Sequence, residues 1–318
     1  TTSRSWNDAA RASRKVQHAC TSHMIPGFQR GLATVNGQSI AYATAGQGPA
    51  VLLLHGFPQT LAMWHAVAPI LAERFTVVAA DLRGYGDSSK PRGTDAYSFR
   101  HMAADQLALM RHLGHAQFHL VGHDRGGRTA HRLALDAPEA VQSLTVMDIV
   151  PTYRLLDPLT RATAQAYYHW FFLSQPAPFP ETMIGHDPDA YFESCLLGWG
   201  GATLADFDAQ ALGAYRKAWR DPETIRGMCA DYRATLALDV DLDAADLDRR
   251  ITCPSLVMYG ADGTMAQQFD HGFRRITHAV SPARRACKRC QSKAGPGSVL
   301  RPGAMSQCPA TRSSDRPG

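Results

Sequence analysis

The seven-residue segment GHDRGGR, residues 122–128, constrains this chain more than any other feature of its sequence. An apolar run at 118–121 precedes it and a stretch with helical spacing follows at 129–135, which predicts a strand, a sharp turn between glycines and a helix. A turn of this kind exposes one side chain at the carboxyl end of a parallel strand, where it can act as a nucleophile. In this chain that side chain belongs to Asp124.

An aspartate at this position restricts the chemistry that the turn can support. A serine here would form the acyl-enzyme of an esterase, whereas a carboxylate can attack a saturated carbon and form an ester that water then cleaves. The segment therefore favours the opening of a carbon–halogen bond or an epoxide over the hydrolysis of an ester.

The length and composition are typical of a soluble α/β protein. The 318 residues are 45% hydrophobic, enough for a large core, and no apolar run approaches the ~18 residues of a membrane span. No charged-then-apolar stretch typical of a signal peptide begins the chain, and seven cysteines, an odd number, favour reduced thiols over a disulfide framework. We therefore expect a cytoplasmic protein that acts away from the membrane.

The positive charge of the chain is concentrated near its C-terminus. Residues 271–318 contain ten Lys or Arg residues and one acid, Asp315, so this segment carries a net charge of +9 while the remainder carries −4. Such a tail could bind nucleic acid, but aromatic residues are not interleaved with the basic ones, which favours a disordered tail without a nucleic-acid partner. Cys287 and Cys290 lack a second cysteine pair at suitable spacing, so no metal is expected.

The order of strand and helix signals predicts an α/β fold with a doubly wound, mostly parallel sheet and an inserted helical cap. Continuous apolar runs at 50–55 and 76–81 are typical of strands buried on both faces, and the residues after 264 lack a strand-like apolar run. The predicted divisions are a disordered extension at 1–27, the core at 28–150, the aromatic-rich cap at 151–245, a return to the sheet at 246–265 and an atypical basic tail at 266–318.

Several segments in this order resemble the α/β-hydrolase superfamily and, within it, the fluoroacetate (haloacetate) dehalogenases. The resemblance spans residues 28 to about 265. Haloalkane dehalogenases and epoxide hydrolases usually place Trp after the nucleophile, whereas this chain has Arg125. The segments that carry the resemblance are HGFPQT at 55–60, DLRGYGDS at 81–88, GHDRGGR at 122–128, MDIVPTY at 147–153, YHW at 168–170, QPAP at 175–178 and DYR at 231–233.

The resemblance implies that Asp124 displaces the halide of a haloacetate and forms a covalent ester, which water cleaves to glycolate without any cofactor. Phe57 and Arg125 would supply backbone N–H groups to the oxyanion. The side chains of Arg125 and Arg128 would hold the carboxylate of this small anionic substrate, and their charges would offset its repulsion by Asp124. The structural alternative for Arg128 is an exposed helix residue paired with a nearby acid.

Further residues of the site follow from the same resemblance. His169, Trp170 and Tyr232 would donate to the leaving halide, although these residues could also simply pack in an aromatic core. Asp148 would orient the catalytic histidine that activates water, with Asp262 as the rival acid.

The catalytic histidine itself is the main departure from the family. The family carries it in a Gly-His-Phe-like loop after the last strand, but only His271 and His278 follow the cap here, and both come too soon after Asp262. The composition beyond residue 265 also resembles a shifted reading frame. Three interpretations stay open: a haloacetate dehalogenase, implied to be a homodimer; an epoxide hydrolase with the same nucleophile and the phenols of Tyr168 and Tyr232; or a half-active or inactive homologue.

Overall fold

The computed structural model describes residues 25–157, 159–198, 202–260 and 280–282. Within these ranges the strands form one eight-stranded sheet in the order β1-β2-β4-β3-β5-β6-β7-β8. β2 pairs antiparallel with β1 and β4, and the other neighbours pair in parallel. The strands are β1 (Gln29–Val35), β2 (Gln38–Ala45), β3 (Ala50–Leu54), β4 (Thr76–Ala80), β5 (Phe118–His123), β6 (Val141–Met147), β7 (Ser255–Met258) and β8 (Val280–Pro282).

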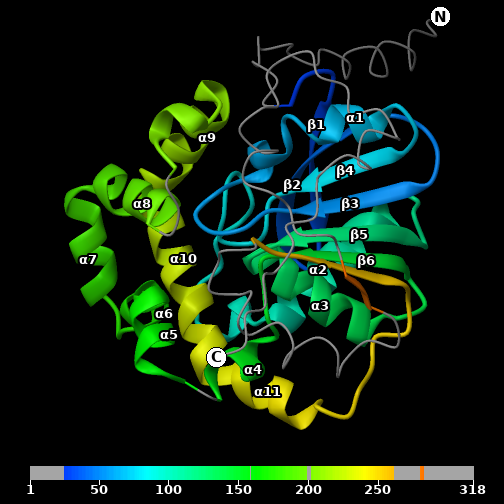
Figure 1. The fold of residues 1–318 in the computed structure, drawn as a ribbon. Coiled ribbons are helices and arrows are strands. Elements are labelled where there is room, and N and C mark those ends of the chain that lie inside the picture. Colours follow the sequence, from blue (N-terminus) through cyan, green and yellow to red (C-terminus); the bar gives the residue numbers. More distant parts are fainter. Residues whose placement is uncertain (1–24, 158, 199–201, 261–279, 283–318) are drawn as a thin grey trace, which may run out of the picture.

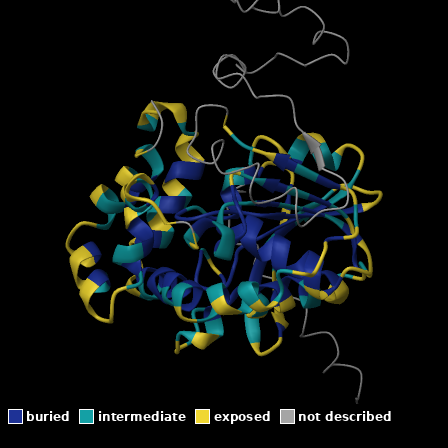
Figure 2. Cartoon of the chain, turned by 60° about the horizontal axis from the view of Figure 1, so that its bottom comes forward, coloured by how far each residue is buried: buried dark blue, intermediate teal, exposed yellow. Residues whose placement is uncertain are grey.

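The central strands are buried on both faces because their apolar runs supply side chains to two cores. Along β3, Leu52 and Leu54 belong to the larger core, whereas Val51 and Leu53 belong to the smaller one. Successive side chains of a strand point to opposite faces of the sheet, so each face of β3 packs against a separate apolar layer. Figure 2 shows the buried residues concentrated along the sheet and the elements packed on it.

Helices cover both faces of this sheet. The helix α1 (Ala68–Ala72) contributes Ala68 to the smaller core. The longer helices α2 (Phe99–His112) and α3 (Arg125–Asp136) pack into the larger core. This arrangement confirms the predicted α/β fold with a doubly wound, mostly parallel sheet. Two 3₁₀ turns, η1 (Leu61–Trp64) and η2 (Asp95–Tyr97), complete the segment before α2.

Between β6 and β7 the chain leaves the sheet and forms a set of helices, which we call the cap. Figure 1 shows most of these helices gathered on one side of the sheet. The helix α10 packs against α6 and α7 within the cap and against η2 of the core. No helix in the described ranges is both long and apolar enough to cross a membrane. The elements of the cap are α4 (Thr152–Leu156), α5 (Arg161–Ala166), α6 (Tyr168–Leu173), α7 (Phe179–His186), α8 (Pro188–Leu197), η3 (Leu204–Asp206), α9 (Ala209–Trp219), α10 (Pro222–Ala234), the π-helical η4 (Thr235–Asp239) and α11 (Val240–Ala245).

The C-terminal part of the described chain includes a strand that the sequence does not indicate. The residues after 264 lack a strand-like apolar run, yet β8 pairs in parallel with β7, with Ser255 opposite Val280. A three-residue strand needs only matching backbone groups, so it leaves no apolar run in the sequence. The rest of the predicted basic tail and residues 1–24 lie outside the described residues, and the predicted domain boundaries stay predictions.

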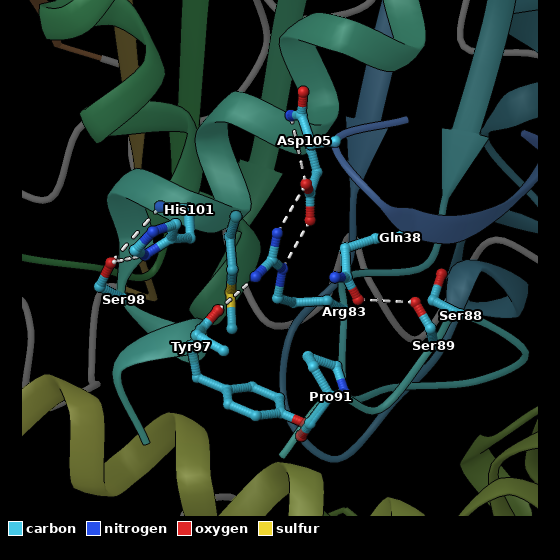
Figure 3. A network of polar contacts seen from close by, with 12 residues as sticks. Gln38, Arg83, Ser88, Ser89, Pro91, Tyr97, Ser98, His101 and Asp105 are labelled. Carbon is cyan, nitrogen blue, oxygen red and sulfur yellow. Dashed lines mark hydrogen bonds and ion pairs between the residues drawn. The ribbon is translucent and has the colours of Figure 1, made fainter. Parts of the chain in front are cut away.

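Polar contacts support the loop that follows β4. Arg83 in this loop donates from Nε and Nη2 to the two carboxylate oxygens of Asp105 on α2 at 2.6 and 2.7 Å, and from Nη1 to the carbonyl of Ala96 at 2.6 Å (Figure 3). Asp81, at the start of the loop, accepts the backbone N–H of Leu61 at 2.8 Å. These contacts hold the loop after β4 against α2 and against the segment that follows β3.

Candidate active site

Asp124 occupies the turn between β5 and α3. Its φ of 45° lies in the left-handed region, which costs a non-glycine residue of order 1–3 kcal/mol. The backbone N–H of Asp124 donates to the carbonyl of Met147 on β6 at 3.2 Å, and the N–H of Arg128 donates to the carbonyl of Asp124 at 3.0 Å. The turn therefore presents a partly exposed carboxylate at the carboxyl end of the central strands.

The glycines around Asp124 are required by the close packing of the turn. A Cβ atom on Gly122 would lie 2.3 Å from the carbonyl oxygen of Gly126, and one on Gly126 would lie 2.4 Å from the carbonyl oxygen of His55. The N–H of Gly126 donates to that same His55 carbonyl at 2.8 Å. Only glycine allows α3 to approach β5 and the end of β3 this closely.

One oxygen of Asp124 is held by the loop that follows β3. The backbone N–H of Phe57 donates to Oδ2 of Asp124 at 2.9 Å. In the described part of the chain no hydrogen bond reaches Oδ1, and the N–H of Arg125, the second expected donor, does not bond to Asp124. Oδ1 therefore has no donor among the described residues, while Oδ2 meets a backbone N–H that can stabilise negative charge.

His55 supports this loop; its segment carries the family resemblance, but the sequence assigns no role to the side chain of His55 itself. Its Nε2 accepts the backbone N–H of Leu82 at 3.1 Å, so the proton of the neutral ring lies on Nδ1, which donates to the carbonyl of Gly56 at 2.9 Å. Burial lowers the pKa of His55 to about 4. A neutral imidazole thus joins the loops that follow β3 and β4.

Arg125 is held by a carboxylate of the cap. Its Nε donates to Oδ2 of Asp231 on α10 at 2.9 Å, and its Nη2 donates to Oδ1 of the same carboxylate and to the hydroxyl of Thr235. Burial opposes the charge of Arg125, but the Asp231 carboxylate outweighs it and raises the pKa of the guanidinium. Within the described residues Nη1 alone has no hydrogen-bond partner. Most of the Arg125 side chain is therefore unavailable to a substrate, which the sequence did not indicate.

Arg128 is buried and pairs with no acid of the described chain. Its Nη1 donates to the carbonyl of Val150 at 2.7 Å and to the hydroxyl of Thr152 at 3.2 Å, and its guanidinium carbon lies 4.5 Å from the Trp170 ring centroid. No carboxylate of the described chain lies within ion-pair distance of Arg128, so the alternative of an exposed, acid-paired residue is wrong. Burial and the charge of Arg125 lower the pKa of Arg128 to about 10, which leaves it charged at neutral pH.

The structure brings the three expected halide donors together beside Phe57. The ring of Tyr232 lies 5.1 Å from Phe57, 5.6 Å from His169 and 5.7 Å from Trp170, measured between centroids. All four residues are buried. The hydroxyl of Tyr232 has no hydrogen-bond partner among the described residues. The cluster joins α6, α10 and the loop after β3 into one wall beside the turn.

The charges at the turn favour the ionised form of Asp124. Burial acts to raise the pKa of this carboxyl, but the surrounding groups outweigh it and hold the pKa below its usual range. Burial disfavours the charged form of His169 as well, and for this base it lowers the pKa to about 4. The imidazole ring is therefore neutral at physiological pH. The groups that lower the pKa of Asp124 are His123, Arg125, Arg128 and the backbone N–H of Phe57.

Asp148 follows β6, as the sequence predicts. Its φ is 54°, and its backbone N–H donates to the carbonyl of Met258 at 2.8 Å. The carboxylate is exposed and makes no hydrogen bond or ion pair with any described residue. The rival acid Asp262 and the two late histidines, His271 and His278, lie outside the described residues. Over the described ranges, no group of three or more His, Cys, Asp or Glu side chains could hold a metal ion.

The doubly wound sheet, the strained turn between β5 and α3 and the helices inserted after β6 together define an α/β hydrolase. The family model of the alpha/beta hydrolase fold matches residues 49–273, and the chain belongs to this family.

Individual relatives extend this assignment. The fluoroacetate dehalogenase of Burkholderia sp. is 55% identical over 250 residues, which cover 78% of this chain and 82% of that protein. The soluble epoxide hydrolase of Corynebacterium sp. (strain C12) is 33% identical over 232 residues, covering 72% and 80%. A solved structure from Nostoc sp. PCC 7120, assigned to the α/β hydrolases, has a TM-score of 0.78 and 45% identity, covering 80% of this chain and 89% of that one. The resemblance seen in the motifs is thereby confirmed.

Proposed function

We propose that this chain is a haloacetate dehalogenase in which Asp124 is the nucleophile. Two independent lines support this function. The chain is similar over most of its length to a fluoroacetate dehalogenase, and the turn presents an ionised carboxylate beside two buried arginines. The proposed substrate is a small anion that carries a halogen on the carbon next to its carboxylate.

In the first step, Oδ1 of Asp124 attacks the α-carbon of the haloacetate from the side opposite the halogen. The carbon–oxygen bond of an ester forms while the carbon–halogen bond breaks, and the halide leaves with the bonding electron pair. No proton moves in this step. Oδ2 stays on the N–H of Phe57, which holds the carboxylate in one orientation.

The observation that carries the proposal is a set of buried donors without acceptors around the turn. Nη1 of Arg125, Nε of Arg128 and the hydroxyl of Tyr232 are buried and unpaired within the described chain. Buried polar groups in native proteins are almost always hydrogen-bonded, so these donors suit a ligand that accepts hydrogen bonds. A haloacetate supplies both a carboxylate and a departing halide, and charge-assisted hydrogen bonds to such groups are strong.

In the second step, water attacks the ester carbonyl carbon, Cγ of Asp124. Negative charge develops on Oδ2, where the N–H of Phe57 already donates. Collapse of this intermediate breaks the bond between Cγ and the ester oxygen. One proton of the attacking water passes to a base and the other ends on the leaving oxygen, so that glycolate is released with its hydroxyl and the carboxylate is restored. We propose that Asp148 orients this base. A chain with a working base would be a full dehalogenase, and a chain without one would be a half-active homologue.

The test is the mass of the peptide that contains Asp124 after the protein is incubated with chloroacetate. We expect a carboxymethyl adduct on Asp124 and release of chloride, because the ester is the product of the first step. The variant Asp124→Asn should show neither. Asp136→Asn, at the exposed opposite end of α3, should react like the wild type. An unmodified Asp124 peptide without halide release would overturn the proposed function.

The number of halide ions released per chain distinguishes the two forms of this proposal. Continued release over many turnovers would support a complete dehalogenase with a working base. Release that stops after one halide per chain, with the ester retained on Asp124, would support the half-active interpretation.

One observation favours a second candidate, an epoxide hydrolase. The unpaired phenol of Tyr232 could protonate an epoxide oxygen, and an epoxide hydrolase is among the relatives. Tyr168, the other phenol expected to help, is exposed at 47%. A neutral epoxide would bring no negative charge to Arg128, which has no carboxylate at ion-pair distance among the described residues, and this is why we favour the haloacetate.

A further inference from the structure

Asp231 and Arg125 form a buried ion pair between the cap and the core. They lie 106 positions apart in the chain, and both side chains are fully buried. The edge of the guanidinium formed by Nε and Nη2 faces the two oxygens of the carboxylate. Because a guanidinium is planar with its donors in a fixed fork, this leaves Nη1 on the opposite side, away from Asp231.

We propose that Asp231 is a positioning residue that holds Arg125 so that Nη1 is the one guanidinium nitrogen left to donate to the substrate carboxylate. The inference rests on the proposed function and adds to it a residue of the cap. It also assigns different roles to the two arginines beside Asp124: Arg125 supplies a fixed hydrogen-bond direction, and Arg128 supplies net positive charge.

Additional contacts fix both members of the pair. The hydroxyl of Tyr85 donates to Oδ2 of Asp231 at 2.6 Å, and the hydroxyl of Thr235 donates to the Asp231 carbonyl at 2.9 Å. The Arg125 guanidinium carbon lies 4.6 Å from the ring centroid of Phe99 and 4.3 Å from that of Tyr232. The guanidinium is thus held by hydrogen bonds along one edge and by aromatic rings near its carbon. Its Nη1 has no hydrogen-bond partner in the described chain.

The charges support this division of roles. Asp231 neutralises Arg125, whereas Arg128 has no carboxylate at ion-pair distance in the described ranges. Attraction of an anionic substrate should therefore depend mainly on Arg128, and the alignment of that substrate should depend on Arg125 and Asp231. Loss of Asp231 should lower the maximal rate of the first step more than it weakens binding.

The rate of Asp124 alkylation by chloroacetate, followed by mass spectrometry over a range of concentrations, tests this inference. For Asp231→Asn we expect a maximal rate about tenfold lower or more, with less than about a threefold change in the half-saturating concentration. Tyr85→Phe, which removes one donor to the same carboxylate, should cause a smaller loss of the same kind and serves if Asp231→Asn does not fold. Combining Asp231→Asn with Arg125→Gln should add little to the loss caused by Arg125→Gln alone, because Asp231 acts through Arg125.

Glu181→Gln provides a matched control. Glu181 forms a two-bond ion pair with Arg233, also on α10, at 2.6 and 2.9 Å, but away from the turn. This variant should alkylate like the wild type. An unchanged rate in Asp231→Asn, or full additivity with Arg125→Gln, would overturn the inference.

A second measurement separates failure of this inference from failure of the proposed function. The Nε–H signal of Arg125 in ¹⁵N NMR should show hindered side-chain rotation in the wild type and in Glu181→Gln, and lose it in Asp231→Asn. A freely rotating Arg125 in the wild type would overturn the positioning role. A wild type that holds Arg125 rigidly but never alkylates Asp124 would instead overturn the proposed chemistry.

Discussion

Two arginines of the same helix meet Asp124 under different electrostatic conditions. Arg125 is neutralised by Asp231, whereas Arg128 is buried and, within the described chain, hydrogen-bonded to neutral oxygens. A buried cation with no carboxylate at ion-pair distance is costly unless a ligand supplies further negative charge. At the residue scale, we therefore expect the charge of Arg128 to select the anionic substrate of the proposed function.

This selection can be measured by comparing chloroacetate with neutral chloroacetamide in the alkylation of Asp124. For Arg128→Met, which keeps most of the side-chain volume, we expect the rate with chloroacetate to fall on the order of 100-fold, because a charged hydrogen-bonded contact is lost. The rate with chloroacetamide or a neutral epoxide should change by less than about threefold. Arg128→Lys should recover part of the chloroacetate rate, because it restores the charge without the planar fork. Equal losses for the charged and neutral reagents would show that Arg128 only packs against Trp170.

At the scale of the elements, the strands and the helix around the turn are held by contacts that only glycine permits. Replacing such a glycine should therefore change the free energy of unfolding. Gly126→Ala places a Cβ 2.4 Å and 2.5 Å from the backbone oxygens of His55 and Leu54, which cannot move without displacing the end of β3. We expect the free energy of unfolding to fall by about 2–3 kcal/mol. Gly213→Ala, in the exposed middle of α9 with open space around it, should instead raise it by about 0.5–1 kcal/mol. Urea unfolding of both variants tests the pair, and equal effects would contradict the packing argument.

The elements differ in how far the sequence could predict them. The turn at Asp124 could be predicted because its signals are local: an apolar run, spaced glycines and a helical stretch within twenty residues. The pairing of Arg125 with Asp231 could not, because no local pattern shows which of many acids meets an arginine more than a hundred residues away. The strand β8 and the contact of the His55 side chain with Leu82 could not be predicted for the same reason, since both depend on partners brought close only by the fold.

At the scale of the whole molecule, the candidate site forms only where the cap meets the sheet. The core contributes Asp124 and the N–H of Phe57, while the cap contributes Asp231, Tyr232 and the pair of residues at 169–170. Any change that loosens the contact between cap and core should therefore affect the chemistry as well as the stability. Burial of neutral histidines on both sides of this contact makes that stability depend on pH.

His55 provides the test of this dependence. Its pKa is lowered to about 4 by burial, against about 6.5 in an unfolded chain, so the unfolded state binds more protons as the pH falls. The stabilisation by neutral His55 is complete above pH 6.5 and is lost as the pH falls toward 4, with about 2 kcal/mol gone by pH 5. Burial raises the pKa of Asp81 to about 6 and that of Asp239 to about 8. These two carboxyls make the free energy of unfolding change with pH in the direction opposite to His55, so the effect of His55 must be measured by replacing that residue alone.

The comparison uses His55→Gln, whose amide can keep one donor and one acceptor in place of the two ring nitrogens. Between pH 7.5 and pH 5, the free energy of unfolding of His55→Gln, measured by urea denaturation, should fall by about 2 kcal/mol less than that of the wild type. The exposed His112→Gln serves as the matched control, and its pH profile should overlay that of the wild type. If His55→Gln loses stability in acid as steeply as the wild type does, His55 is not a group whose protonation opposes the packing of the loops behind Asp124.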